Sequence, residues 1–406
     1  MISSFAEARE VYRERDLRQG LYDAGAVVMD GVLVNLHGEE HKQRRRIENR
    51  TFRRATFDHY ENDLFPGVVE RTLAPHAANG GTDLVSFGHE LMLSLAAVTA
   101  GVDRPVGDAE ETARLHEYVK YFIEGATLVH SNRDREERSA IIAEQLQLWR
   151  ADFLAGSIER RRSLLARVDE GTLDENELPR DILTALLRYG PELGLEDAVL
   201  TREIAFFLLA GAHTSATAFT RAIDHTLSWL AARPELAELA RNDRLFVQRC
   251  VHETIRLNPS SPTGMRRALR SITLPSGRAI PEGTLVIIDL ERVNRDPSVF
   301  GPDAAEFNPH RVTPEGVAPF GLSFAAGMHV CIGQDLAGGV VPPRGATDAV
   351  DGHLYGLVSI AVQRMFRAGV RRDPAHPPEI DASTQRPYWS RYQVLLDPQP
   401  DAEARA

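Results

Sequence analysis

The sequence predicts a mainly α-helical protein with a smaller β portion toward its C-terminal end. Apolar residues recur at helical spacing as far as about Leu257. The clearest helical stretches are residues 91–100, 141–167 and 181–188. One long helix is expected over residues 195–232, and apolar side chains cover most of its circumference at residues 204–210. At about 1.5 Å per residue this helix would be roughly 50 Å long, enough to cross the whole molecule.

The β portion is expected after Pro259, where the pattern of the sequence changes. Short strand-like runs at residues 271–274 and 285–290 alternate with turns at residues 275–277 and 281–283, which contain proline or glycine. The chain contains no internal repeat. We therefore expect residues 1–406 to form a single domain.

Composition and charge narrow the range of functions. The chain is 43% hydrophobic and carries a formal net charge of −11, so general attraction to nucleic acid or to a membrane surface is not expected. Its longest strongly apolar run, residues 204–212, is much shorter than the roughly 20 residues of a membrane-spanning helix. The N-terminus has no apolar signal core, and Cys250 and Cys331 do not form a metal-type pair. These features fit a protein of the reducing cytoplasm.

A glycine-rich loop surrounds one of the two cysteines. Residues 324–333 read FAAGMHVCIG, so Cys331 lies between Gly327 and Gly333 and follows Phe324. The glycines would let the loop pass closely under a flat ligand with the cysteine sulfur facing it. A helix is expected to begin at residues 332–337, and its N-terminus would favour the thiolate, a strong ligand for haem iron. A chance match to this spacing is expected about once in a thousand such chains, which argues against a merely structural cysteine.

The loop resembles the haem-binding loop of the cytochrome P450 family, and other segments resemble further motifs of that family in the same order. Residues 210–215, AGAHTS, lie in the long helix and are similar to the oxygen-activation motif. Residues 253–256, ETIR, match Glu-x-x-Arg, and residues 294–297, NRDP, are a common family run. Residues 307–311, FNPHR, resemble the segment whose arginine joins the Glu-x-x-Arg pair. The resemblance implies the cytochrome P450 fold, with haem b (iron protoporphyrin IX) between the long central helix and the cysteine loop.

The resemblance also implies roles for individual side chains at the haem. Cys331 would be the axial ligand of the iron, and Phe324, Gly327 and Gly333 would shape its loop. Four residues match positions that bind the haem propionates in relatives, namely His41, Arg45, Arg266 and His329. Arg267 adjoins Arg266, so a shift of one residue would exchange the two.

Glu253 and Arg256 are three residues apart and would share one face of a helix. Read alone, such a pair is most often exposed and contributes less than about 1 kcal/mol. In the family it is buried with a third residue, which would be Arg311 in this chain. The resemblance therefore implies a buried network that holds the loop carrying Cys331.

Basic side chains are concentrated between His41 and Arg54, against one acid, Glu48. The seven are Lys42, Arg44, Arg45, Arg46, Arg50, Arg53 and Arg54. A nucleic-acid site would require interleaved aromatic residues and a basic protein, and neither is present. In relatives this helix lies on the cysteine side of the haem, so we expect a docking face for an acidic electron donor of the ferredoxin or flavodoxin type.

The long helix departs from the family pattern at one position. The resemblance assigns Ala210, Gly211, His213 and Thr214 to oxygen activation, and Gly211 would let the helix bulge to leave room for dioxygen. Relatives usually have an acid where this chain has His213. Three alternatives are open: His213 or water delivers protons in place of the acid, the reaction demands fewer protons, or His213 faces away and is inert.

The resemblance implies a monooxygenase that inserts one oxygen atom from O2 into a medium-sized, moderately apolar small molecule, with electrons from NAD(P)H. Peroxide-driven oxidation, dehydrogenation, coupling and non-catalytic haem binding are the alternatives. The main candidates for the substrate pocket are Phe206, Phe207, Thr263, Met265 and Trp389. Further candidates are Tyr22, Val27, Met29, Leu209, Ser261 and Tyr388.

Two segments depart from the family in length. The sequence begins at what looks like the second helix of the family, so the usual first helix and strand are expected to be missing or reduced. After Cys331, residues 338–343, GGVVPP, should interrupt the next helix because adjacent prolines cannot continue it. Helical periodicity resumes at residues 354–366.

Overall fold

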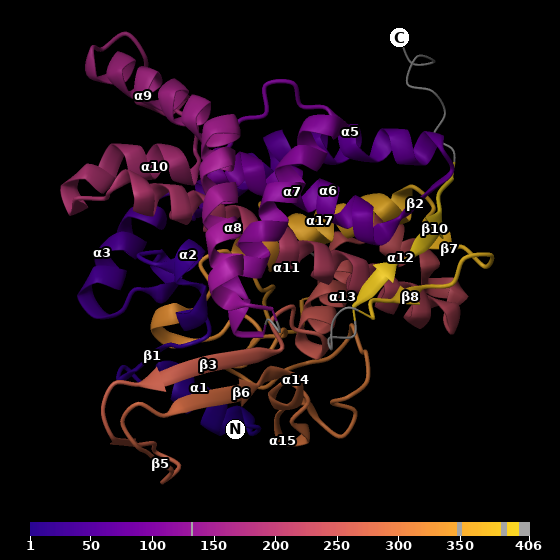
Figure 1. Cartoon of the computed structure of the whole chain (residues 1–406). Coiled ribbons are helices and arrows are strands. Elements are labelled where there is room, and N and C mark those ends of the chain that lie inside the picture. Colours follow the sequence, from indigo (N-terminus) through magenta and orange to yellow (C-terminus); the bar gives the residue numbers. More distant parts are fainter. Residues whose placement is uncertain (131–132, 347–350, 383–387, 398–406) are drawn as a thin grey trace.

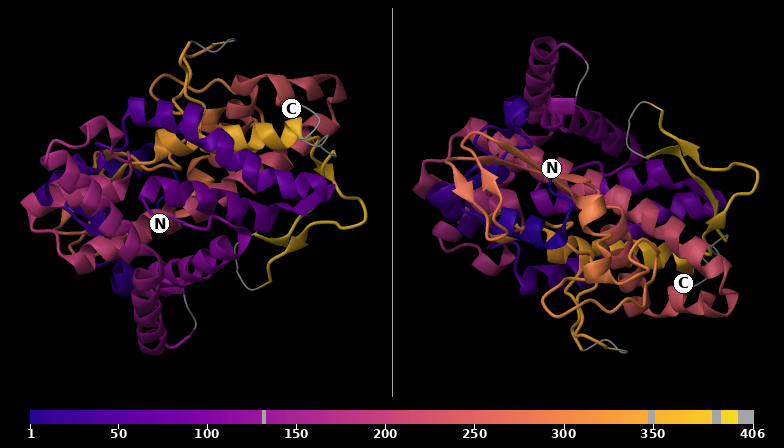
Figure 2. Two further views of the ribbon diagram at one scale, coloured as in Figure 1. Left: turned by 90° about the horizontal axis from the view of Figure 1, so that it is seen from above. Right: turned by 90° about the horizontal axis from the view of Figure 1, so that it is seen from below.

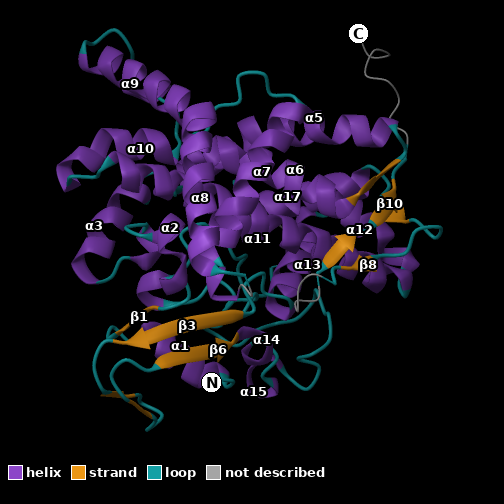
Figure 3. Cartoon of the chain, in the orientation of Figure 1, coloured by secondary structure: helices purple, strands orange, loops and turns teal. Residues whose placement is uncertain are grey.

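Helices make up most of the protein, as predicted, and the strands form small sheets at its edges (Figure 3). This computed structural model describes residues 1–130, 133–346, 351–382 and 388–397. The helices are α1 (Phe5–Arg13), α2 (Ala26–Met29), α3 (Gly38–Glu48), α4 (Arg54–His59), α5 (Phe65–Ala78), α6 (Leu84–Ala100), α7 (Ala109–Ala126), α8 (Arg135–Trp149), α9 (Ala155–Asp169), α10 (Ile182–Tyr189), α11 (Asp197–Ala231), α12 (Ala237–Asn242), α13 (Arg244–Leu257), α14 (Leu290–Val293), α15 (Pro297–Phe300), α16 (Gln334–Gly338) and α17 (Leu357–Arg367). The strands are β1 (Leu17–Gln19), β2 (Gly81–Asp83), β3 (Thr263–Ala268), β4 (Ile272–Thr273), β5 (Ala279–Ile280), β6 (Leu285–Asp289), β7 (Arg371–Arg372), β8 (Glu379–Ile380), β9 (Trp389–Arg391) and β10 (Gln393–Leu395).

The long helix α11 runs through the centre of the molecule (Figure 1). It has 35 residues and lies within two residues of its predicted ends. Ile204 and Leu208 are fully buried, as expected of a helix that is covered on nearly all sides. Helix α6 packs along it, and the absence of a side chain at Gly211 allows the close approach, because a Cβ there would lie 3.2 Å from the Cβ of Ala96.

Local sequence signals explain where several helices begin and end. Helix α6 begins after Asp83, whose carboxylate accepts the backbone N–H groups of Val85 and Ser86 at 3.2 and 3.4 Å. It ends at Gly101, which adopts a left-handed conformation with φ 88°. The helical stretch predicted at residues 141–167 is helical throughout, in α8 and α9, which a π-helical turn at Arg150–Leu154 joins without a break.

The three-stranded antiparallel sheet β1-β3-β6 lies on one side of the helices (Figure 1). Strand β6 confirms the prediction for residues 285–290, and β4 lies within the predicted run 271–274. The pairing of β1 with β3 places Gln19 opposite Arg266, although the two residues are far apart in the sequence. Before α1, Ile2 makes only an isolated parallel bridge, to Ile288.

The helix that follows the cysteine loop ends early, as predicted, at Gly338. Residues 339–346 then leave the body of the molecule, and residues 351–356 return to it before α17 (Figure 2). Gly356 packs so closely against the start of this excursion that a Cβ on it would lie 2.2 Å from the backbone nitrogen of Gly339. The side chain of Gln248 on α13 holds the start of this segment by donating to the carbonyl oxygens of Gly338 and Val340 at 3.1 and 3.0 Å.

Candidate active site

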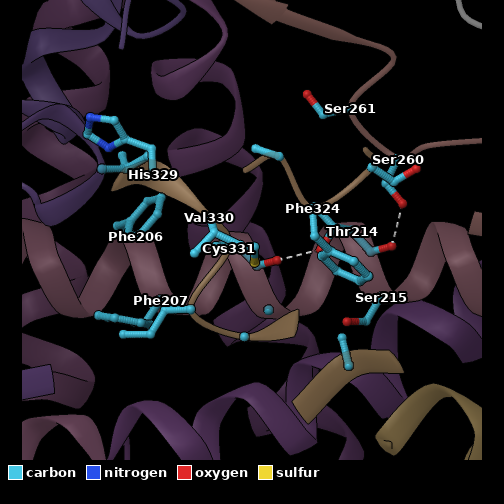
Figure 4. Close-up of a pocket in the computed structure, with 18 of the residues that line it drawn as sticks. Phe206, Phe207, Thr214, Ser215, Ser260, Ser261, Phe324, His329, Val330 and Cys331 are labelled. Carbon is cyan, nitrogen blue, oxygen red and sulfur yellow. Dashed lines mark hydrogen bonds between the residues drawn. The ribbon is translucent and has the colours of Figure 1, made fainter. Parts of the chain in front are cut away.

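A cavity of about 350 Å³ lies between α11 and the loop before α16 (Figure 4). Cys331 lines it from the loop, and Ala210, Gly211 and Thr214 line it from α11. None of the described residues that line the cavity is an aspartate or a glutamate. The volume is in the range of small-molecule pockets, roughly 300–1,000 Å³.

The cysteine loop is fixed by its backbone. The N–H of Cys331 donates to the carbonyl oxygen of Phe324 at 2.9 Å, which folds the loop back on itself. Gly327 has φ 71°, and a Cβ there would lie 2.3 Å from the carbonyl oxygen of Tyr12, so a side chain does not fit. A Cβ on Gly333 would meet only the Phe52 ring, at the ordinary contact distance of 3.9 Å. Of the two glycines, only Gly327 is therefore required by its protein surroundings.

Opposing effects act on the pKa of the Cys331 thiol, including the predicted one from the N-terminus of the following helix. Enclosure by the protein raises the pKa of the Cys331 thiol, although an N–H group of Gly333 and the charge of Arg45 act in the opposite direction. The helix that follows, α16, has only five residues. A coordinated metal ion would add a positive charge at the sulfur and favour the thiolate.

Glu253, Arg256 and Arg311 meet in the interior. Nε and Nη2 of Arg256 donate to the Glu253 carboxylate at 2.7 Å each, and Nε of Arg311 donates to it at 3.0 Å. The remaining N–H groups of Arg256 reach the carbonyl oxygens of Asn294, Ala304 and Glu306. The Arg256 side chain is 0% exposed, and all of its donors are in use.

Asn294 connects this network to the cysteine loop. Its carbonyl oxygen accepts from Arg256 at 2.6 Å, and its side-chain oxygen accepts the N–H of Leu322 at 2.8 Å. Its side-chain nitrogen donates to the hydroxyl of Ser323 at 2.8 Å. Ser323 directly precedes Phe324. The network of Glu253, Arg256 and Arg311 therefore holds, through Asn294, the segment from which the cysteine loop starts.

Basic side chains gather at one part of the cavity lining: His41, Arg45, Arg266 and His329. Arg266 is held by Gln19, whose side-chain oxygen accepts from it at 3.0 Å, whereas the neighbouring Arg267 pairs with Asp23 at 3.1 Å and does not line the cavity. Burial and the nearby Arg45 lower the pKa of His41 to about 4. Burial and Arg266 likewise lower the pKa of His329 to about 3.

Comparison with known proteins identifies the family. The Cytochrome P450 family model matches residues 145–338. Pulcherriminic acid synthase from Bacillus subtilis (strain 168) is 28% identical over 347 residues, which cover 83% of this chain and 78% of that protein. Cytochrome P450 monooxygenase milC from Cordyceps militaris is 32% identical over 192 residues, but these cover only 35% of its length and 45% of this chain.

Solved structures share the fold across nearly the whole chain. P450BioI, solved in complex with hexadec-9Z-enoic acid ligated acyl carrier protein, superposes with a TM-score of 0.72 at 18% identity, covering 97% of this chain and 91% of that one. HmtT, involved in himastatin biosynthesis, gives 0.72 at 20% identity, covering 97% and 90%. This chain belongs to the cytochrome P450 family. It is therefore a P450 enzyme, and its cofactor is haem b.

The cavity of this P450 fits haem b. Nδ1 of His41 and both ring nitrogens of His329 are buried without a hydrogen-bond partner among the described residues. Two arginines and two histidines line the cavity, and none of its described lining residues is an acid, so an anionic group would balance the charge of the arginines and accept hydrogen bonds from the N–H groups of all four. The two propionates of haem are anions of this kind. The sulfur of Cys331 lies in the same cavity for the iron.

The P450 oxygen-activation motif presents one polar side chain to the cavity. Thr214 is exposed there, its hydroxyl donates to the carbonyl oxygen of Ala210 at 2.7 Å, and Ser260 donates to the carbonyl oxygen of Thr214 at 2.8 Å (Figure 4). The expected bulge at Gly211 is absent, since α11 is continuous through it. His213 does not line the cavity, and its ring stacks on that of His89 with 5.8 Å between centroids.

Most of the predicted pocket residues line the cavity, and a few do not. Phe206, Phe207, Thr263 and Met265 line it, together with Tyr22, Leu209 and Ser261. Trp389 does not, because its ring packs over the guanidinium of Arg221 at 5.0 Å and against Tyr392. Met29 and Val27 belong to the packing of a hydrophobic core, and Tyr388 donates to the carbonyl oxygen of Ser260 at 3.1 Å.

Several lining residues were missed from the sequence. They include Tyr12, Gln19, Val34, Phe52, Met92 and Ser260. Gln19 reaches the cavity because β1 pairs with β3, and no local sequence pattern predicts that pairing. Ser260 could have been found, because it adjoins the predicted Ser261 on the turn after α13.

The basic segment is only partly a surface. Arg44 is buried and donates to the Glu203 carboxylate at 2.9 Å, so its inclusion in a docking face was wrong. The exposed members are Lys42, Arg46, Arg50, Arg53 and Arg54. No helix within the described ranges is long and apolar enough to cross a membrane.

Proposed function

We propose that this chain is a haem-thiolate monooxygenase that oxidises a neutral, largely apolar small molecule, with Cys331 as the axial ligand of the iron. One observation carries the proposal: a single cavity, free of acids among its described lining residues, joins the Cys331 sulfur, a cluster of basic side chains and the Thr214 hydroxyl. Haem b, when bound, supplies the reductive activation of O2 by which one oxygen atom enters the substrate. The side chains of this protein hold that group, enclose the substrate and handle the protons.

Each group of side chains has its own part. His41, Arg45, Arg266 and His329 bind the propionates, and their buried N–H groups gain the acceptors that the protein itself lacks. Thr214 provides a hydroxyl on the wall opposite Cys331, where its oxygen can accept a hydrogen bond, or its hydrogen can turn from the carbonyl oxygen of Ala210 to dioxygen. Glu253, Arg256 and Arg311 keep the cysteine loop in place through Asn294.

The lining also supports a class of substrate. Phe206 and Phe207 lie to one side of Cys331, and the hydroxyls of Ser260 and Ser261 lie to the other (Figure 4). Among the lining residues that the structure describes, the arginines are Arg45 and Arg266, both in the propionate cluster, and no lysine or acid is present. A neutral molecule with an apolar body and one hydrogen-bonding group fits this arrangement. Library screening by the low-to-high spin shift is expected to select such molecules and to reject organic cations.

An acidic electron donor of the ferredoxin or flavodoxin type fits the basic surface near α3. A second cavity, of about 940 Å³, opens there beside the cysteine loop. Its charged lining residues include Arg13, Arg15, Lys42, Arg46 and Arg53, with Glu14 as the acid. Opposite charge speeds the encounter of such partners.

Replacing each of the two cysteines tests the proposal. Cys331→Ser is expected to abolish the long-wavelength Soret band that marks thiolate ligation in the reduced, carbon monoxide-bound protein. The matched control is Cys250→Ser, because Cys250 is fully buried on α13 and does not line the cavity. An unchanged band in Cys331→Ser, or a protein that takes up no haem, would refute the proposal.

A further inference from the structure

Three histidine side chains from three helices stack in a row behind the oxygen-activation motif. The ring of His213 on α11 lies 5.8 Å from that of His89 on α6, with 15° between the planes. The ring of His89 lies 5.1 Å from that of His116 on α7, with 26° between the planes. None of the three lines the cavity. We call them the histidine row.

Burial disfavours the charged form of two members of the row, His89 and His116. Burial, followed by the charges of His213, His116 and Lys120, lowers the pKa of His89 to about 3. Burial and Lys120 lower the pKa of His116, and Glu117 opposes them. The ring of Tyr388 faces His213 at 6.3 Å. A neutral imidazole has one N–H donor and one acceptor nitrogen, so it can accept a proton on one side and release one on the other.

The two ends of the row lie in different surroundings. His116 is half-buried, and its neighbours Glu117 and Lys120 are exposed, so this end meets solvent. At the other end, His213 directly precedes Thr214, which faces the cavity. Tyr388 beside His213 donates to the carbonyl oxygen of Ser260, and Ser260 donates to that of Thr214. The row therefore runs from the solvent side of α7 to the residue that directly precedes Thr214 on α11.

A metal site does not explain the row. Among the described residues, no group of three or more histidine, cysteine, aspartate or glutamate side chains is placed to hold a metal ion. The rings are stacked face to face and do not converge on a point. Rings stacked in this way do not point their N–H groups at one another, so a proton would pass between them through a bridging water molecule at the ring edges.

We propose that His116, His89 and His213 form a proton path from solvent to the Thr214 side of the cavity. At each step an imidazole gains a proton on its unprotonated nitrogen and loses the proton of its other nitrogen, so no ring changes its net charge once the step is complete. The proton is consumed in monooxygenation, which uses two protons and two electrons from the donor for each O2. The inference rests on the proposed function, and it gives His213 the task that an acid performs in relatives.

The test measures proton exchange directly, in the reduced, carbon monoxide-bound holoprotein with ¹⁵N-labelled histidine. We expect the ring N–H of His213 to exchange with solvent at least about tenfold more slowly in His116→Gln than in the wild type, because glutamine cannot relay a proton. The matched control is His76→Gln: His76 is also half-buried and contacts α6 through Glu90, but it lies outside the row. This control should exchange at the wild-type rate.

An unchanged exchange rate at His213 in both His116→Gln and His89→Gln would overturn the proton path. The optical band of the same carbon monoxide-bound samples reports on Cys331 separately, so failure of the path and failure of the proposed function are distinguishable. As a second readout, the reduced holoprotein is mixed with O2 in H2O and in D2O. His116→Gln should reoxidise more slowly and with a larger solvent isotope effect than the wild type, and His76→Gln should match the wild type in both. If His116→Gln also matches the wild type, the path is refuted.

Discussion

Replacing Glu253 by alanine tests how the buried charges support the cysteine loop. The Glu253 carboxylate, in a residue only 3% exposed, accepts four hydrogen bonds. Two come from Arg256 at 2.7 Å, one comes from Arg311 at 3.0 Å and one comes from the backbone N–H of Asn308 at 3.1 Å. Alanine would leave the fully buried guanidinium of Arg256 with a positive charge and no anion.

The expected cost follows from that stranded charge. Removing one partner of a buried ion pair destabilises a protein by roughly 3–5 kcal/mol. The whole folding free energy of a protein is only about 5–15 kcal/mol, so a large fraction of the stability is at stake. Because Arg256 also holds Asn294, and Asn294 holds Leu322 and Ser323, the loss should be felt at the loop that carries Cys331.

The assay is the ratio of haem to protein after purification, together with the midpoint of thermal unfolding. We expect Glu253→Ala to be largely haem-free and poorly folded. Glu238→Ala is the matched control, because Glu238 and Arg241 have the same spacing of three on a helix but are exposed, at 67% and 45%. Such a pair contributes less than about 1 kcal/mol. If Glu253→Ala keeps the haem content and the unfolding midpoint of this control, the reasoning is wrong.

Three further measurements follow from the structure. Burial raises the pKa of Glu48 well above 4.5 and that of Glu203 to about 7, so the folded protein binds more protons than the unfolded chain and loses stability as the pH rises from about 4.5 to 7. Glu48→Gln should flatten this loss in unfolding experiments, and an unchanged slope would contradict the argument. Gly327→Ala should lose haem and unfold at a lower temperature, because its Cβ would clash with the backbone of Tyr12 and Arg13. Gly156→Ala is the control, because the space around Gly156 is open. Equal haem content in the two variants would show that the loop can adapt. In stopped-flow experiments, the reduction of this protein by an acidic ferredoxin should slow steeply as the salt concentration rises. Arg46→Glu should slow it roughly tenfold at low salt, because Arg46 is exposed on the basic surface. A rate that does not depend on salt would contradict a basic docking face.

The sequence predicts those features that depend on neighbours along the chain. Helix α11 carries its own apolar periodicity over 35 residues, and its ends fall where expected. The break after α16 follows from the two glycines and two prolines of residues 338–343. The cysteine loop is recognisable because its glycine spacing is local, and the strained approach of Gly327 to the Tyr12 carbonyl gives that spacing a physical reason.

Features set by contacts between distant segments could not be predicted. Arg44 looks like one of seven surface cations until α11 places Glu203 beside it. Gln19 joins the cavity only because β1 pairs with β3. Trp389 packs against Arg221 of α11 and against Tyr392, which follows β9, and so does not line the pocket. In each case the local sequence allows the observed position, but the partner that selects it is remote.

The geometry of one helix explains how this chain can differ from its relatives at His213 and still keep the oxygen side of the cavity. Successive residues of an α-helix are rotated by about 100°, so Thr214 and His213 point in different directions from α11. Thr214 faces the cavity, and His213 faces α6 and α7, where His89 and His116 lie. A substitution at position 213 therefore changes the groups behind the helix and leaves the lining of the cavity as it was. We expect the consequence of the histidine to appear in the supply of protons and not in the choice of substrate.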